Sequence, residues 1–165
     1  IRKAVVYVSQ EDFLFTASVR ENLKMGNEEI SDEEMIEISR KMGVHQFVSK
    51  MERAYDSVLE ERGKNLSKGQ RQKLSLTRAI LRHPKILILD EATSNMDSIS
   101  EREILNYIKG IRDITLILIS HRINVIADSD CIYVLQKGNI VARGTDKQLK
   151  EQCKLYRQLY GEEEK

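Results

Sequence analysis

Four consecutive apolar residues, Ile86-Leu87-Ile88-Leu89, run directly into two acids, Asp90 and Glu91. An apolar run without polar alternation is typical of a strand buried on both faces of a parallel sheet. Acids at the carboxyl end of such a strand lie at the edge where open α/β folds bind ligands. Asp90 is suited there to hold Mg²⁺, and Glu91, pointing the other way, to take a proton from water. A strand that merely ends in two solvated acids is the alternative interpretation.

Two further apolar runs, Ala4–Val8 and Thr115–Ile119, are rich in β-branched residues, and helical patterns separate the three runs. Alternation of this kind predicts βαβ connections and a three-layer α/β fold with a parallel sheet. The long segment between the first two strands predicts an inserted α-helical subdomain over about residues 18–84. Residues 1–17 and 85–165 are then assigned to the α/β core.

Local signals predict the helix ends within this insert. The segments Ser31–Glu34 and Ser67–Gln70 both have the spacing of a capping box at a helix start. Gly43 and Pro84 are expected to end the two helices. Between them, Tyr55–Asn65 is expected to be a loop.

The last third of the chain predicts a hairpin followed by helix. The pair Lys137-Gly138 separates the apolar runs Cys131–Leu135 and Ile140–Arg143, as in a two-residue β-turn. Thr145 with Gln148 predicts the start of a closing helix. Residues 162–165 are expected to be a disordered tail.

Composition excludes several classes of protein. The net charge of +1 gives no excess of either sign to favour nucleic acid or an anionic membrane. No apolar run approaches the roughly 20 residues that span a bilayer. Cys131 and Cys153 lie outside any metal-ligand spacing and are interpreted as buried or incidental thiols. The chain by itself is expected to be soluble, and its abrupt start at Ile1 suggests a piece of a longer protein.

A second candidate site precedes the acids by one helix. Ser67 and Gly69 open that helix in the segment Asn65-Leu66-Ser67-Lys68-Gly69-Gln70. Free backbone N–H groups and the positive end of the helix dipole suit a phosphate there. Gly69 allows a close approach of the backbone, and the Ser67 hydroxyl adds a donor. An ordinary helix cap is the alternative.

Taken together and in order, these features resemble the ATP-binding-cassette (ABC) ATPases across the whole chain. Five of the family's motifs have counterparts: the Q-loop glutamine, the signature motif, the Walker B strand, the D-loop and the switch histidine. They are matched by Gln10, Leu66–Gln70, Ile86–Glu91, Ser94–Asp97 and His121, respectively.

The resemblance implies a P-loop NTPase core with ATP and Mg²⁺ as ligands. Asp90 and Gln10 would hold Mg²⁺, Glu91 would polarise the attacking water, and His121 would contact the γ-phosphate. The fold of such a core is the three-layer α/β arrangement expected above.

The resemblance also implies two such domains in a head-to-tail dimer. Ser67, Gly69 and Gln70 of one subunit would close over the ATP held by the other, and Asp97 would signal across the dimer. Homodimer and heterodimer both remain open.

Local motifs are similar to the exporter branch of the family, namely Phe13–Phe15, Ser18–Leu23 and Glu60–Gly63. They imply transmembrane domains as partners, a place on the cytoplasmic face of the cell membrane, and ATP hydrolysis that powers export. Nucleic acid is not expected as a partner. A charged solvated loop is the alternative for Glu60–Gly63, and nothing in the sequence names the transported substrate.

Two departures from the family stand out. Lys68 replaces a glycine that the signature motif usually has, which suggests a tuned site. No Gly-x-x-x-x-Gly-Lys-[Ser/Thr] phosphate loop (Walker A) occurs, since Gly63-Lys64 is the only Gly-Lys pair. We therefore expect a truncated domain that is inactive alone.

The rival hypotheses are a naturally truncated regulatory or scaffold module and a soluble ABC-type ATPase of DNA repair or translation.

Overall fold

The computed structural model describes residues 4–10 and 13–163. The chain divides into two compact units, Ile1–Ile117 and Leu118–Lys165, and each is described by itself. The expected division into a helical subdomain over 18–84 and a core made of the remainder is a different partition and stays a prediction.

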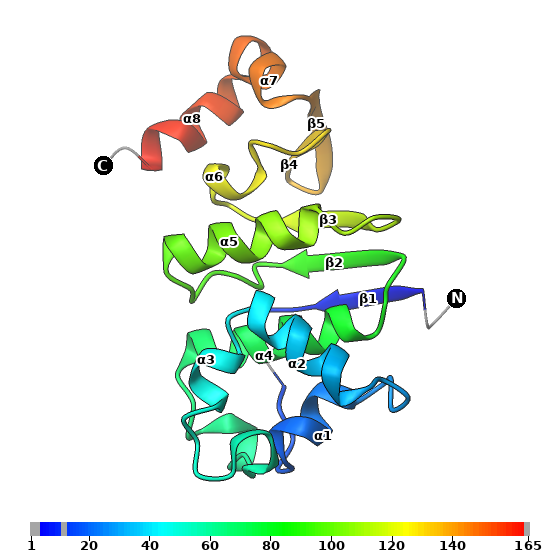
Figure 1. Ribbon diagram of the computed structural model, residues 1–165. Coiled ribbons are helices and arrows are strands. Elements are labelled where there is room, and N and C mark those ends of the chain that lie inside the picture. Colours follow the sequence, from blue (N-terminus) through cyan, green and yellow to red (C-terminus); the bar gives the residue numbers. More distant parts are fainter. Residues whose placement is uncertain (1–3, 11–12, 164–165) are drawn as a thin grey trace. The chain divides into compact units, whose positions relative to one another are not determined.

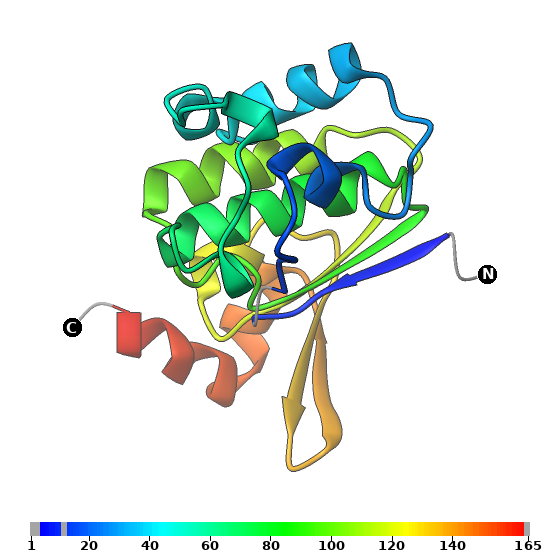
Figure 2. The same cartoon turned by 90° about the horizontal axis from the view of Figure 1, so that it is seen from below.

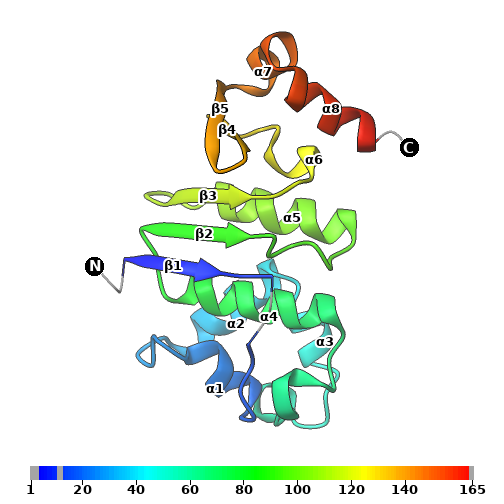
Figure 3. The same ribbon diagram turned by 180° about the vertical axis from the view of Figure 1, so that it is seen from behind.

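A parallel sheet carries the candidate acids. Its strands are β1 (Val5–Val8), β2 (Ile86–Asp90) and β3 (Thr115–Ile119), in the order β1-β2-β3. β1 and β2 run in the same direction, with Val5 opposite Ile86 and Val8 opposite Leu89 (Figure 1, Figure 3). The mixed α/β class and the parallel sheet predicted from the apolar runs are confirmed.

Helices separate the strands, as the sequence predicts. Between β1 and β2 lie α1 (Val19–Lys24), α2 (Asp32–Lys41), α3 (His45–Val48) and α4 (Lys68–Leu81), and between β2 and β3 lies α5 (Ser98–Lys109). Two short 3₁₀ turns interrupt the predicted loop Tyr55–Asn65: one over Ala54–Asp56, which begins one residue before it, and one over Glu61–Gly63. Figure 2 shows the helices of this unit on one side of β1 and β2.

The helix caps follow the sequence signals with one difference. Ser67 and Gln70 form both bonds of a capping box, whereas Ser31 forms only one, accepting from the Glu34 backbone N–H. α2 ends at Lys41, ahead of Gly43, whose φ is 69°. α4 ends three residues before Pro84, because His83 already has a left-handed φ of 48°.

Burial of α4 makes it the central helix of the first unit. It packs against α1, α2 and β1, and Leu74, Leu76 and Leu81 are essentially inaccessible to solvent. Each such leucine contributes roughly 1.5–3 kcal/mol when buried. This packing anchors α4 against β1, the strand that pairs with β2.

The second unit builds its own core. It contains α6 (Ile123–Ile126), β4 (Ile132–Gln136), β5 (Asn139–Gly144), α7 (Asp146–Gln152) and α8 (Lys154–Glu163). The predicted hairpin is confirmed, with Lys137 and Gly138 at positive φ in its turn. Thr145 and Gln148 form the predicted capping box of α7. The backbone of α8 extends through Glu163, into the expected tail 162–165, whose last two residues lie outside the described part.

Candidate functional site

Asp90 is the last residue of β2, at the carboxyl edge of the sheet. The Tyr7 hydroxyl on β1 donates to Asp90 Oδ2 at 2.7 Å. This bond is the main cause that raises the pKa of Tyr7 above its ordinary value. It also orients the carboxylate and uses only one of the two oxygens. Sequence reasoning missed Tyr7, whose signal was a polar hydroxyl in an otherwise apolar strand.

Glu91 begins a sharp turn immediately after the strand. Its φ of 49° is left-handed, a conformation that a side chain with a Cβ rarely adopts and that clusters at functional sites. The Ser94 N–H donates to the Glu91 carbonyl oxygen at 3.2 Å and closes the turn. Ala92 and Thr93 within the turn are buried. Asp90 and Glu91 therefore leave the strand on a fixed backbone.

Gln10 follows β1 by two residues and is exposed. Because β1 and β2 are parallel with Val8 opposite Leu89, the segment after β1 leaves the sheet at the same edge as Asp90.

In the described ranges, no three His, Cys, Asp or Glu side chains group to hold a metal ion. One carboxylate plus an amide oxygen fits Mg²⁺ that is shared with nucleotide phosphates and water. The residues present thus suit a magnesium nucleotide and not a closed protein cage.

The start of α4 is built as predicted. Ser67 Oγ accepts from the Gln70 N–H at 3.2 Å, and Gln70 Oε1 accepts from the Ser67 N–H at 2.9 Å. Ser67 and Lys68 are exposed. The N–H groups of Lys68 and Gly69 lie in the first helical turn, where no intrahelical acceptor exists, so they fit a phosphate. The Gln70 side chain is engaged in the cap.

Gly69 lies directly against the loop that follows the acids. A Cβ built at Gly69 would be 3.0 Å from the carbonyl oxygen of Asn95. One turn further along α4, Gln72 Oε1 accepts from the Asn95 backbone N–H at 3.0 Å. The signature segment and the D-loop segment of the same chain are therefore in contact. Nothing in the sequence singles out Gln72, because it is one of several polar residues along α4.

Asp97 caps α5. Its Oδ1 accepts from the Ser100 N–H at 2.9 Å, and this backbone hydrogen bond is the main cause that lowers the pKa of Asp97. The side chain is exposed. Asp97 thus caps α5, in addition to the signalling across a dimer that the sequence leads us to expect of it.

His121 belongs to the second unit. It is exposed and follows the end of β3 by two residues. Since the two units are described separately, its approach to the acids stays an expectation from the sequence.

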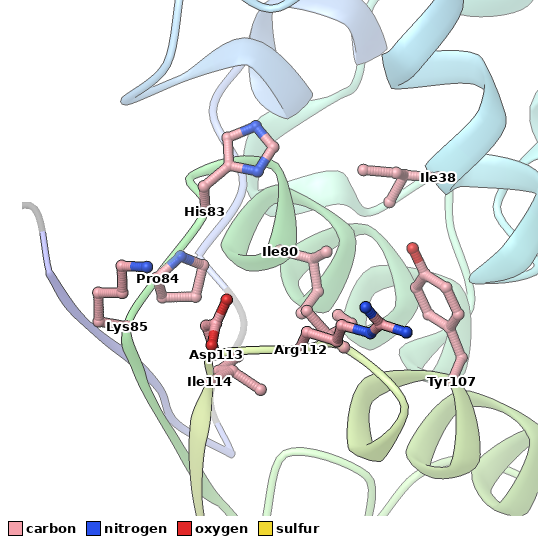
Figure 4. Close-up of a pocket in the computed structure, with 10 residues that line it drawn as sticks. Ile38, Ile80, His83, Pro84, Lys85, Tyr107, Arg112, Asp113 and Ile114 are labelled. Atoms are coloured by element: carbon pink, nitrogen blue, oxygen red, sulfur yellow. The ribbon is translucent and has the colours of Figure 1, made fainter.

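A pocket of about 220 Å³ lies elsewhere in the first unit (Figure 4). Lys85 and Ile114, which precede β2 and β3, are among the residues that line it, with His83, Tyr107 and Arg112. It therefore lies at the amino ends of the strands. None of the predicted site residues lines it, so the candidate site is the opposite edge.

Comparison with known proteins agrees with the motifs. Residues 1–94 match the family model described as ABC transporter. A putative export ATP-binding/permease protein of Rickettsia conorii is 40% identical over 99% of this chain and 28% of its own length. The leptomycin B resistance protein of Schizosaccharomyces pombe is 41% identical over 98% of this chain and 12% of its own length.

A solved structure of a bacterial Atm1-family ABC exporter with ATP bound superposes with a TM-score of 0.93. It is 31% identical and covers 98% of this chain, which spans 29% of that structure. The chain thus spans less than a third of each of these relatives. It belongs to the ABC transporter family, as an ATP-binding domain.

Proposed function

We propose that this chain is the part of an ABC exporter that supplies the acids and the signature motif for ATP hydrolysis, which in turn powers transport across the membrane. The observation that carries the proposal is the edge of the sheet where Tyr7 holds Asp90 and where Glu91 starts a left-handed turn. Names of the similar proteins, which include exporters, support the direction of transport.

In this proposal Asp90 and Gln10 hold Mg²⁺, which neutralises charge on the phosphates when it is bound. Glu91 accepts a proton from the attacking water. His121 donates to a γ-phosphate oxygen, as a neutral imidazole can. The fixed backbone at Glu91 supports its role, because a base has to be held within hydrogen-bond reach of the water.

The signature segment acts on a second nucleotide-binding domain. Ser67 and Gly69 present donors to the ATP held by that partner, while Gln70 keeps the helix start in shape through its cap. Asp97 lies beyond the turn and communicates between the two sites. The exposed Ser67 and the first-turn N–H groups of α4, which have no acceptor within the helix, support this assignment.

A surface of the first unit fits the transmembrane partner. Phe13, Phe15 and Val58 are 55%, 39% and 59% exposed, respectively, and the two phenylalanine rings are 4.7 Å apart. A bridge between Ser18 and Val58 holds the two segments side by side. Exposed aromatic side chains in a cluster are typical of interaction sites. We assign this surface to contact with the transmembrane domains on the cytoplasmic face.

No phosphate loop occurs in this sequence, so we further propose that the chain alone does not turn over ATP. In a complete domain, the backbone N–H groups and the lysine of a phosphate loop cradle the phosphates. Steady hydrolysis by the isolated chain would contradict this part of the proposal.

The test of the proposed function is magnesium-dependent ATP hydrolysis by the full-length protein that contains this chain. Asp90→Asn should reduce kcat by about a hundredfold or more, because it removes the charge that holds Mg²⁺. Glu103→Gln, at an exposed position of α5, is the matched control and should retain parental activity. Hydrolysis that survives in Asp90→Asn would contradict the proposal.

A further inference from the structure

Gln72 is a fully buried amide in the second turn of α4, with 0% of its surface exposed. Its Oε1 accepts from the Asn95 backbone N–H at 3.0 Å, and its Nε2 lies 3.5 Å from Ser94 Oγ. Because a backbone N–H only donates, the Asn95 N–H fixes which way the amide faces. A buried amide is costly unless it is bonded, so this side chain is specifically matched to the loop.

Neighbouring residues on the same face of α4 reach the same segment. Gly69, three positions earlier, lies close to the Asn95 carbonyl oxygen. Lys73 Nζ donates to Ser100 Oγ at 2.9 Å. Residues spaced by three and four share one face of a helix. The start of α4 is therefore joined to residues 94–100 at three positions.

The loop that Gln72 holds leads back to Glu91 through two consecutive turns. The Met96 N–H donates to the Thr93 carbonyl oxygen at 3.1 Å, and the Ser94 N–H donates to the Glu91 carbonyl oxygen at 3.2 Å. Thr93, which belongs to both turns, is buried. The backbone between Glu91 and Asn95 therefore has little freedom to move. A shift of Asn95 is then passed to the backbone that carries the proposed base.

We propose that Gln72 is a positioning residue: it fixes the turn that carries Glu91 and ties that turn to the signature end of α4. The inference rests on the proposed function, in which Ser67 engages a nucleotide on the partner domain. Ser67 caps α4, and Gln72 on the same helix holds the loop that leads back to Glu91. Engagement of Ser67 at one nucleotide therefore sets Glu91 for the other.

Amide hydrogen exchange at Asn95 tests the contact in this chain directly. Gln72→Met keeps the side-chain length but removes the acceptor, so the Asn95 amide should exchange about tenfold faster. Thr77→Val is the matched control. Thr77 is equally buried on α4, but its Oγ1 donates within the helix to the Lys73 carbonyl oxygen at 2.7 Å. An unchanged Asn95 exchange rate in Gln72→Met, or equal acceleration in Thr77→Val, would overturn the inference.

Hydrolysis by the full-length protein tests the consequence. Gln72→Met should lower kcat about tenfold while KM for ATP stays within about twofold, because the base is misplaced and the ATP-holding groups are not. The Hill coefficient for ATP should fall toward one, while Thr77→Val should keep the parental values.

Parental kcat and Hill coefficient in Gln72→Met would overturn the positioning role. Glu91→Gln separates this failure from a failure of the proposed function. If Glu91→Gln abolishes hydrolysis and Gln72→Met does not, the positioning role alone is wrong. If Glu91→Gln still hydrolyses ATP, the proposed function itself is wrong.

Discussion

Tyr7 and Asp90, 83 positions apart in the chain, meet through a 2.7 Å hydrogen bond at the carboxyl edge of the sheet. The parallel register that places Tyr7 opposite Ile88 brings them together. Asp90 is thereby oriented by a neighbouring strand before any ligand arrives. Such preorganisation reduces the free-energy cost of ordering the site when a ligand binds.

Tyr7→Phe should raise the Mg²⁺ concentration needed for half-maximal ATP hydrolysis by the full-length protein several-fold. The substitution removes the hydroxyl that orients Asp90 but keeps the ring. Tyr133→Phe, at a tyrosine of the second unit that is 50% exposed, is the control. A Mg²⁺ titration of both variants is the measurement, and an unchanged midpoint in Tyr7→Phe would show that the bond does not prepare the site.

Gly69→Ala should destabilise the chain by about 1 kcal/mol, although alanine is the better helix former. Its Cβ would meet the Asn95 carbonyl oxygen at 3.0 Å, and neither backbone can yield without moving the loop. Lys68→Ala, at the preceding exposed position, should have little effect. Urea unfolding of both variants gives the comparison. Stabilisation by Gly69→Ala would show that α4 and the loop are not in close contact.

Asp146 should make the second unit sensitive to acid. Burial raises the pKa of Asp146, but hydrogen bonds from Tyr160, Lys150 and Tyr156 outweigh it, and the net pKa is lowered. A carboxyl whose folded pKa is depressed stabilises the fold above its unfolded pKa of about 3.9. That stability is lost as the pH falls through the lower, folded pKa.

Thermal unfolding at several pH values between neutrality and pH of about 3 tests this sign. Asp146→Asn should be less stable than the parent at neutral pH by about 1 kcal/mol, because it loses charge-assisted bonds. The difference should shrink as the pH falls. If the stability difference between the parent and Asp146→Asn instead grows as the pH falls, folding raises the pKa of Asp146 and does not lower it.

Most of the fold followed from short-range signals. The strand Ile86–Asp90 was evident because four apolar residues in a row suit a covered strand. The helix starts at Ser67 and Thr145 were evident because a cap needs only residues three apart. The 3₁₀ turns Ala54–Asp56 and Glu61–Gly63 were not predicted. The second contains Arg62 at a φ of 55°, and arginine is not a residue type that indicates a left-handed backbone.

The candidate site was predicted only in part. Asp90, Glu91 and Ser67 were found because strand ends and helix caps are visible in sequence. Tyr7 was missed because its partner is set by the register between two strands. Gln72 was missed because its partner is a backbone N–H 23 positions away, and a backbone group leaves no mark on the sequence.

The most direct test of the central claim is single-turnover ATP hydrolysis by the full-length protein with Glu91→Gln. Gln retains the size of Glu but accepts no proton, so the variant should bind Mg²⁺-ATP and leave it intact, with the chemical step slowed by about a hundredfold or more. Cleavage of ATP at the parental rate in Glu91→Gln would contradict the account, because the edge of the sheet described here would then not supply the base.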